Sequence, residues 1–134
     1  MPKTCVVIYQ ERNGTVPLLD WLEGIPTGAQ DACIARVELL AERGCDLRRP
    51  HCENLGYDIW ELRARVLNVH YRILYAFVGQ HSVLLSHGFI KKKRKVQKIE
   101  IQRAVDNLNK YRQEPKAHTY VGRFDYGKKK TNDK

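Results

Sequence analysis

Arginines and lysines stand where three neighbouring segments of the chain could bring them together. Arg63 ends the segment "YDIWELR", Arg72 lies inside "VHYRILY", and five cations, Lys91–Lys95, follow "LLSHGFI". A guanidinium group stays charged and donates two parallel hydrogen bonds, which suits it to the oxygens of a phosphate. Cations fixed beside a phosphodiester also stabilise the negative charge of its transition state. The pattern therefore favours binding of a phosphate ester and chemistry at its phosphorus atom.

Cleavage of RNA by transesterification is one reaction that such a cluster would assist without a metal ion. The ribose 2′-OH attacks the adjacent phosphorus and the 5′-oxygen leaves, so a general base and a general acid are also needed. The candidates for this proton transfer are Glu61, Tyr75 and His87, which lie near the cations in the sequence.

Two of these three side chains also have a structural interpretation. If its strand alternates regularly, His87 shares a side with Val83, Leu85 and Phe89, which is typical of a packed and hydrogen-bonded histidine. Glu61 shares a side with Arg63, and an ion pair between them would hold the arginine in place. The sequence leaves the general base and acid open.

The cations have structural interpretations as well. Arg63 would be a surface cation at a strand edge, whereas Arg72 stands in an otherwise apolar segment, where an arginine needs a specific reason. A lysine run is usually a solvated turn or helix start, and Lys91–Lys95 also matches a generic nuclear-import pattern. Five cations before a helix oppose the helix dipole, however, and this favours an anion bound there.

The charge of the chain indicates a polyanionic partner. The 134 residues contain 24 Lys and Arg against 15 Asp and Glu, a net charge of +9 at pH 7. This balance favours RNA, DNA, the ribosome or an acidic protein segment, without choosing among them. No apolar run approaches the ~20 residues that span a bilayer, and the first apolar stretch is too short for a signal peptide. We therefore expect one domain in the cytoplasm, with no membrane partner.

The cysteines predict free thiols. Cys5, Cys33, Cys45 and Cys52 form no CxxC pair, and free thiols are the default in a reducing compartment. Cys45, His51 and Cys52 lie close in sequence, but their spacing fits no common zinc pattern and a fourth ligand is not evident. Neither a metal nor another cofactor is expected.

Hydrophobic periodicity divides the chain into strands and helices. A β-branched run at 5–9 predicts a first strand, and Thr15 would cap a short helix after it. The clearest helix covers 27–44, with capping-box spacing at Thr27 and Gln30. The later elements are a loop at 45–56, strands at 57–63, 68–78 and 81–90, a six-residue hairpin connection from Ala64 to Val69, and a helix at 96–112.

The order of strand, helices, three strands and helix is typical of an α+β domain. Short links between successive strands predict an antiparallel meander, so the expected fold is a small twisted antiparallel sheet with helices packed on one face. The opposite face would be partly open and basic, which would suit RNA. This domain is expected to cover 1–112, followed by a basic, flexible tail at 113–134.

Four motifs together resemble a known family. They are "YDIWELR", "YRILY", "LLSHGFIKKK" and a final helix with "EIQRA", and in this order they cover about residues 55–111. The segment resembles the RelE/HigB-like toxins of type II toxin–antitoxin modules, in particular their phage-derived branch. The resemblance implies a compact RelE-like toxin, an endoribonuclease that cleaves mRNA in the ribosomal A site and inhibits translation. It also implies a cognate antitoxin, often a helix-turn-helix DNA-binding protein.

The resemblance further implies roles for individual residues. Arg63, Arg72, Lys91 and Lys92 match positions where the family places basic residues for phosphate binding and transition-state stabilisation. Replacement of Arg72 by alanine is then expected to abolish cleavage and to leave the fold intact. The other cations of the run would help RNA or the ribosome to dock: Lys93, Arg94 and Lys95.

The chain departs from better-known relatives at two places. The strand before "LR" carries Asp58, Ile59 and Glu61 where some relatives carry lysines. A C-terminal tyrosine of those relatives is matched only loosely, by Tyr111 or a tyrosine of the tail. Two alternatives therefore stay open: a gyrase-poisoning, ParE-like toxin that shares the sheet, and a non-catalytic nucleic-acid-binding module.

Overall fold

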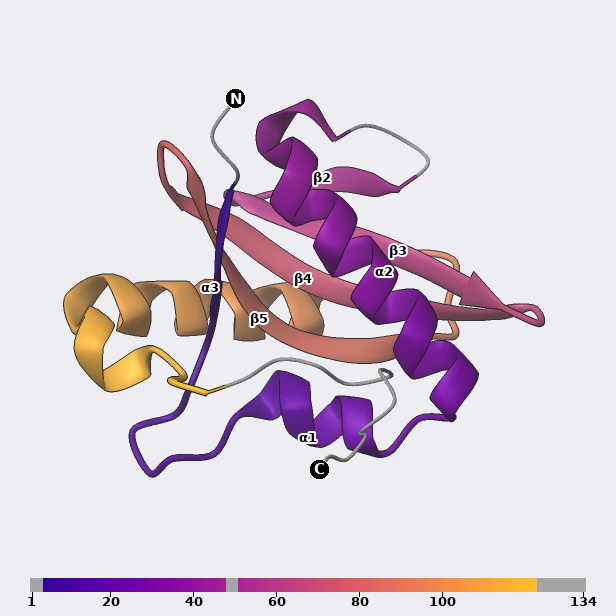
Figure 1. The fold of residues 1–134 in the computed structure, drawn as a ribbon, viewed down its shortest axis with the longest axis horizontal. Helices are drawn as coiled ribbons and strands as arrows, with labels where there is room; N and C mark the ends of the chain where they lie inside the picture. Colours follow the sequence, from indigo (N-terminus) through magenta and orange to yellow (C-terminus); the bar gives the residue numbers. More distant parts are fainter. Residues whose placement is uncertain (1–3, 48–50, 123–134) are drawn as a thin grey trace, which may run out of the picture.

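A computed structural model describes residues 4–47 and 51–122 of the chain. The strands form one five-stranded sheet in the order β1-β5-β4-β3-β2 (Figure 1). No helix within the described ranges is long and apolar enough to cross a membrane. The elements are β1 (Cys5–Ile8), α1 (Pro17–Glu23), α2 (Thr27–Arg43), β2 (Cys52–Gly56), β3 (Ile59–Val66), β4 (Val69–Gly79), β5 (Ser82–Lys91) and α3 (Lys98–Gln113), with short 3-10 turns at Gly44–Asp46 and Pro115–His118.

The sheet is mixed rather than wholly antiparallel. The strands from β2 to β5 run antiparallel to their neighbours, which confirms the predicted meander and the α+β class. β1 instead pairs in parallel with β5, with Cys5 opposite Ser82 and Ile8 opposite Leu85. A parallel pair needs a long crossover connection, and the two helices and three strands between β1 and β5 provide it. The expectation of an antiparallel sheet is therefore wrong at this edge.

Helices cover both faces of the sheet, so the expectation of helices on one face is wrong. α1 and α2 pack on one face, here called the α2 face, against Tyr71, Ile73 and Tyr75 of β4. α3 packs on the opposite α3 face, against Leu74 and Ala76 of the same strand. Figure 1 shows α2 in front of the strands and α3 behind them. The letters "ILYAFV" of β4 are a continuous apolar run, which is typical of a strand buried on both faces.

The β3–β4 hairpin closes through two residues, not through the six that were expected. β3 continues to Val66, and only Leu67 and Asn68 lie between the strands, with φ angles of 49° and 70°. A two-residue hairpin turn needs this left-handed backbone. Asparagine adopts it readily, but leucine does not. Leu67 therefore carries no sequence signal for the turn.

The segment that was expected to be a loop, 45–56, contains the edge strand β2. This strand runs antiparallel to β3, with Cys52 opposite Leu62 and Glu53 opposite Glu61. Its polar residues hide the alternation by which a strand is predicted. The pairing of β2 with β3 places Glu53 on the same face as Glu61.

A β-bulge at Ser86 changes the direction of the side chains along β5. Leu85 pairs with Tyr75, and His87 pairs with Leu74, the residue just before Tyr75. One extra residue therefore stands in β5. His87 points to the α3 face, so the expectation that it shares a side with Leu85 is wrong.

The helix starts differ from the expected caps. α1 begins at Pro17 and α2 at Thr27, and neither helix has a side-chain hydrogen bond at its N-cap. Gln30 instead donates its amide to the carbonyl of Leu22 at 2.7 Å. The caps expected from Thr15, and from Thr27 with Gln30, are not formed.

The first part of the expected tail packs against the N-terminal region. Residues Pro115–His118 form a short turn, and His118 Nδ1 lies 2.8 Å from the carbonyl oxygen of Gln10. The His118 ring stacks on the Tyr9 ring. Residues 123–134 of the expected tail lie outside the described residues.

α1 approaches β5 closely because Gly88 has no side chain. The indole of Trp21 occupies the position that a Cβ atom on Gly88 would take. Any larger residue would displace the indole or the helix. The glycine of the "GF" motif therefore sets the distance between α1 and the sheet.

We expect Gly88→Ala to lower the free energy of unfolding by about 1–3 kcal/mol, because the new methyl group would overpack against Trp21. Gly28 offers a matched control, since it lies in α2 with nothing near its Cβ position. Gly28→Ala is expected to keep stability or raise it by up to about 1 kcal/mol. Urea denaturation measures both values. A Gly88→Ala variant as stable as the unmodified protein would contradict the close contact.

Candidate functional site

Arg63 and Arg72 lie directly opposite each other on the α3 face. They are register partners in the β3–β4 pair, so their side chains project from the same face of the sheet. Arg72 is in turn opposite Phe89 of β5, and His70 is opposite Lys91, the last residue of that strand. The two arginines and the start of the basic run thus come together, as the sequence predicted.

The carboxylate of Glu61 joins the two arginines. Glu61 Oε1 accepts a hydrogen bond from Arg63 Nε at 2.8 Å, and Glu61 Oε2 lies 3.3 Å from Arg72 Nε. Arg63 Nη2 also donates to Glu53 of β2 at 2.6 Å. Glu61 is 1% exposed and Arg72 is 6% exposed, whereas the Arg63 side chain keeps 28% of its surface exposed. Arg63 is therefore the arginine of this pair that meets solvent.

The charges of this cluster balance. Two arginines stand against the carboxylates of Glu53 and Glu61. Burial lowers the pKa of Arg72, Glu61 opposes this effect, and Arg63 lowers the pKa further. Among the described residues, Arg72 Nε and Glu61 Oε2 have no hydrogen-bond partner, so their contact is electrostatic. Excess positive charge for an anion must come from elsewhere.

The basic run supplies that excess charge. The chain turns back after β5 toward α3, and this loop and the first turn of α3 form a groove with strands β2 and β3. Arg63 and Glu61 line one part of it, and Lys91, Arg94 and Lys95 line another. We call this hollow the basic groove. Its other wall residues are Glu53, Asn54, Leu55, Val96 and Ile101.

His70 lies in a positive field at this end of the sheet, and this field contributes to a lowered pKa. Burial lowers this pKa, and the charges of Arg72, Arg65 and Lys91 lower it further. A proton on His70 is thus disfavoured first by burial and then by the cations around it. The same field would attract a polyanion.

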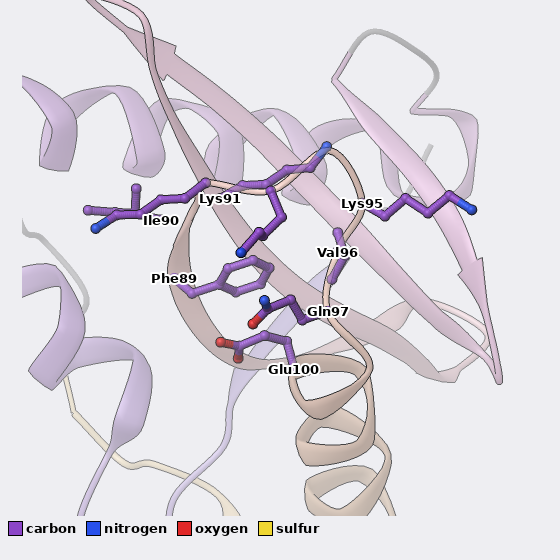
Figure 2. A pocket seen from close by; sticks show the side chains of 9 residues that line it. Phe89, Ile90, Lys91, Lys95, Val96, Gln97 and Glu100 are labelled. Atoms are coloured by element: carbon purple, nitrogen blue, oxygen red, sulfur yellow. The ribbon is translucent and has the colours of Figure 1, made fainter.

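A second hollow, the loop pocket, is lined by the same loop. It encloses about 170 Å³. Phe89, Gln97 and Glu100 line it together with lysines of the basic run. Figure 2 shows the Phe89 ring, the Gln97 amide and the Glu100 carboxylate directed into one space, while Lys95 points away from them. The pocket thus combines an aromatic ring and two polar groups with the cations of the loop.

The basic run divides between the two hollows. Lys91 and Lys95 line both, and Arg94 lines only the basic groove. Lys92 and Lys93 line only the loop pocket. Lys92, which was expected to be a catalytic cation, therefore does not line the groove that holds the arginine cluster.

His87 lies in a buried chain of hydrogen bonds that ends at the loop pocket. Its Nε2 atom is 2.9 Å from Glu100 Oε1, and its Nδ1 atom is 2.8 Å from Ser86 Oγ. Asn107 donates its amide to Ser86 Oγ at 2.9 Å. A carboxylate only accepts, so Nε2 carries the proton and Nδ1 accepts from the serine. His87 is 1% exposed, and it holds Glu100 in place rather than facing the groove.

Tyr75 lies on the α2 face, away from the arginines. It is 1% exposed, and burial together with a hydrogen bond to Cys52 raises its pKa above the ordinary value. The structure does not bring Tyr75 together with the other candidates.

The sequence did not predict a role for several residues of the basic groove and the loop pocket. Glu53 lies in the unpredicted strand β2, and Gln97 and Phe89 stand beside the charged run without a pattern of their own. Glu100 did carry a signal, because an acidic residue in the first turn of a helix is favoured by the dipole. Within the part of the chain that the structure describes, no three His, Cys, Asp or Glu side chains are grouped to hold a metal ion.

Replacement of Arg72 by alanine is expected to destabilise the fold, which changes the earlier expectation of an intact fold. The variant would leave the buried Glu61 carboxylate without Arg72, at a cost of about 3–5 kcal/mol. Arg63→Ala removes a partly exposed partner and is expected to cost only about 1–2 kcal/mol. Urea denaturation of both variants measures the difference. Equal, small losses would show that Arg72 does not stabilise Glu61.

Acidification is expected to weaken the fold through His87. Burial lowers its pKa, the hydrogen bond to Glu100 opposes this, and Arg103 lowers the pKa further. The unfolded chain binds a proton below about pH 6.5, and the folded protein resists it, so the free energy of unfolding falls as the pH drops through this range. His87→Gln keeps groups that can form both hydrogen bonds and is expected to flatten this slope. Urea denaturation of both proteins at several pH values measures this pH dependence. An unchanged slope in His87→Gln would show that His87 does not cause the loss of stability in acid.

Comparison with known protein families shows which family this chain belongs to. The family model described as Phage derived protein Gp49-like matches residues 20–109, more than half of the 134 residues. The match includes every residue of the basic groove and of the loop pocket. A search of curated proteins found no match. The phage-derived character is thereby confirmed, while the narrower RelE/HigB assignment stays a prediction. The chain belongs to the phage-derived Gp49-like family.

Proposed function

We propose that this protein is the toxin of a toxin–antitoxin module and cleaves mRNA on the ribosome. Membership of the Gp49-like family supports a toxin-like role. The observation that carries the nuclease part is the basic groove, where Arg63 and cations of the loop meet beside the buried pair of Arg72 and Glu61. The proposed partners are ribosome-bound mRNA and a cognate helix-turn-helix antitoxin, and the proposed location is the cytoplasm.

The groove suits the phosphate of a single-stranded RNA. Arg63 is held by two carboxylates, so its orientation is set before a ligand arrives. Lys91, Arg94 and Lys95 add three positive charges that the cluster does not balance. Cations that are fixed in advance stabilise a transition state better than cations that must first reorient.

The proposed reaction is an internal transesterification. The 2′-oxygen forms a bond to phosphorus and loses its proton to a base, while the bond from phosphorus to the 5′-oxygen breaks and that oxygen takes up a proton. The products are a 2′,3′-cyclic phosphate and a 5′-hydroxyl. The groove supports the electrostatic part of this reaction, the stabilisation of charge on the phosphate oxygens.

A non-catalytic nucleic-acid-binding module is the second candidate. The observation in its favour is that Glu61, Tyr75 and His87, the three groups expected to transfer protons, are each 1% exposed. Binding to a polyanion needs only the cations of the groove. Salt-sensitive RNA binding without cleavage would favour this candidate.

Mapping of mRNA 5′ ends after brief induced expression tests the nuclease proposal. We expect cuts within translated regions, in frame with the codons. Replacement of Lys91 and Lys95 together by glutamine should reduce the cuts at least about tenfold, because two positive charges leave the lining of the groove. The matched control replaces Arg112, in the last turn of α3, and Lys116, in the short turn that follows it, by glutamine, and it should keep the cuts.

Three other outcomes would contradict the nuclease proposal or the place of its site. Growth arrest with DNA damage and intact mRNA would indicate the gyrase-poisoning alternative. RNA binding with intact mRNA would indicate the binding module. Equal cutting by the Lys91 and Lys95 variant and by its control would show that the groove is not the site.

A further inference from the structure

The loop pocket has the lining of a nucleobase site. Phe89 offers an aromatic face, and Gln97 and Glu100 offer an amide and a carboxylate directed into the same space (Figure 2). The volume of about 170 Å³ is below the roughly 300–1,000 Å³ of sites for drug-sized ligands. It suits one base of a longer chain.

We propose that the loop pocket binds a guanine base of single-stranded RNA, with Phe89 stacking on the base and Glu100 reading its Watson–Crick edge. The proposal rests on the proposed function for the identity of the ligand as RNA. It adds a base-specific contact to a groove that otherwise recognises only phosphate.

Phe89 is positioned for stacking. It is partly buried, and its ring lies 6.1 Å from the ring of the buried His87, between centroids. The neighbouring imidazole thus supports one part of the ring while the pocket adjoins another. Unpaired bases in RNA are commonly bound by stacking on aromatic side chains of this kind.

Glu100 selects among the bases. A carboxylate only accepts hydrogen bonds, so it favours the base with the most donors on one edge. Guanine presents two adjacent donors, N1–H and the N2 amino group, whereas adenine presents only an amino group there. Gln97 lies in the same lining and can donate to the O6 atom of guanine.

A buried chain fixes the Glu100 carboxylate for this task. His87 donates to Oε1, and Ser86 and Asn107 fix His87 from behind. Glu100 itself keeps 25% of its side chain exposed. Three buried polar groups thus orient one accessible carboxylate, which is the arrangement that a specific recognition site requires.

The pocket and the groove are close enough for one RNA strand. Lys91 and Lys95 line both hollows. A strand that places a guanine in the loop pocket therefore brings a neighbouring phosphate to the lysines at the border. The base contact would then set which phosphate enters the groove.

Isothermal titration calorimetry with short RNAs tests the proposal. The ligands are 2′-O-methyl pentanucleotides, which have no free 2′-OH for cleavage, with adenine at every position or with a central guanine or inosine. We expect the guanine ligand to bind about tenfold more tightly than the adenine ligand. Inosine lacks the N2 amino group, so its affinity should fall between the two.

Two variants and one control test whether the preference for guanine arises in the loop pocket. Glu100→Gln keeps an acceptor for His87 but loses the carboxylate, and it should bind the three ligands almost equally. Asp106→Asn makes the same change of charge on the exposed side of α3, and it should keep the preference for guanine. Phe89→Leu should weaken all three ligands to a similar extent, because stacking does not depend on the base.

Equal affinity of the unmodified protein for the three ligands, or an unchanged preference in Glu100→Gln, would overturn the proposal. Thermal unfolding of each variant confirms that it is folded. Because these ligands cannot be cleaved, the result is separate from the test in cells. A guanine preference without mRNA cuts would keep the base site and reject the nuclease, and cuts without a guanine preference would do the reverse.

Discussion

The buried carboxylate of Glu61 is the interaction on which the cationic end of this molecule depends. A lone charge inside a protein is unfavourable by several kcal/mol, so neither Glu61 nor Arg72 would be tolerated there without the other. The strand register places Arg63 against the same carboxylate. Two arginines are thereby oriented without any ligand. This preorganisation is the condition under which charged groups assist chemistry at a phosphate.

The β-bulge at Ser86 has a comparable influence on the loop pocket. The extra residue turns His87 to the α3 face, where it binds Glu100 in the first turn of the helix. The basic loop is therefore anchored at both ends, by its strand at Lys91 and by this hydrogen bond. Anchoring explains how five adjacent cations are kept close together despite their mutual repulsion.

The sequence predicted what depends on short-range pattern and missed what depends on pairing across the chain. The meander and the α+β class follow from alternation and short links between strands. The sequence also indicated that a hairpin could bring Arg63 and Arg72 together, but the register that makes them direct partners depends on a two-residue turn that was not predicted. Glu53 gains its role only when β2 pairs with β3, and the side on which His87 lies depends on one inserted residue. The loop pocket arises from the path of a loop, which no periodicity describes. The apolar run of β4 did indicate burial on both faces, and the expected one-sided packing overlooked it.

The parallel pairing of β1 with β5 has a consequence for how the chain reaches its native state. Residues 5–8 are synthesised well before their partners in the sheet, residues 82–85. At about 5–20 residues per second, the first strand waits roughly 4–15 s for its neighbour to be synthesised. The contact also closes one of the longest loops in the molecule, which slows its formation. The sheet is therefore completed late, and the newly made N-terminal strand passes through a period in which it is unpaired and open to other partners.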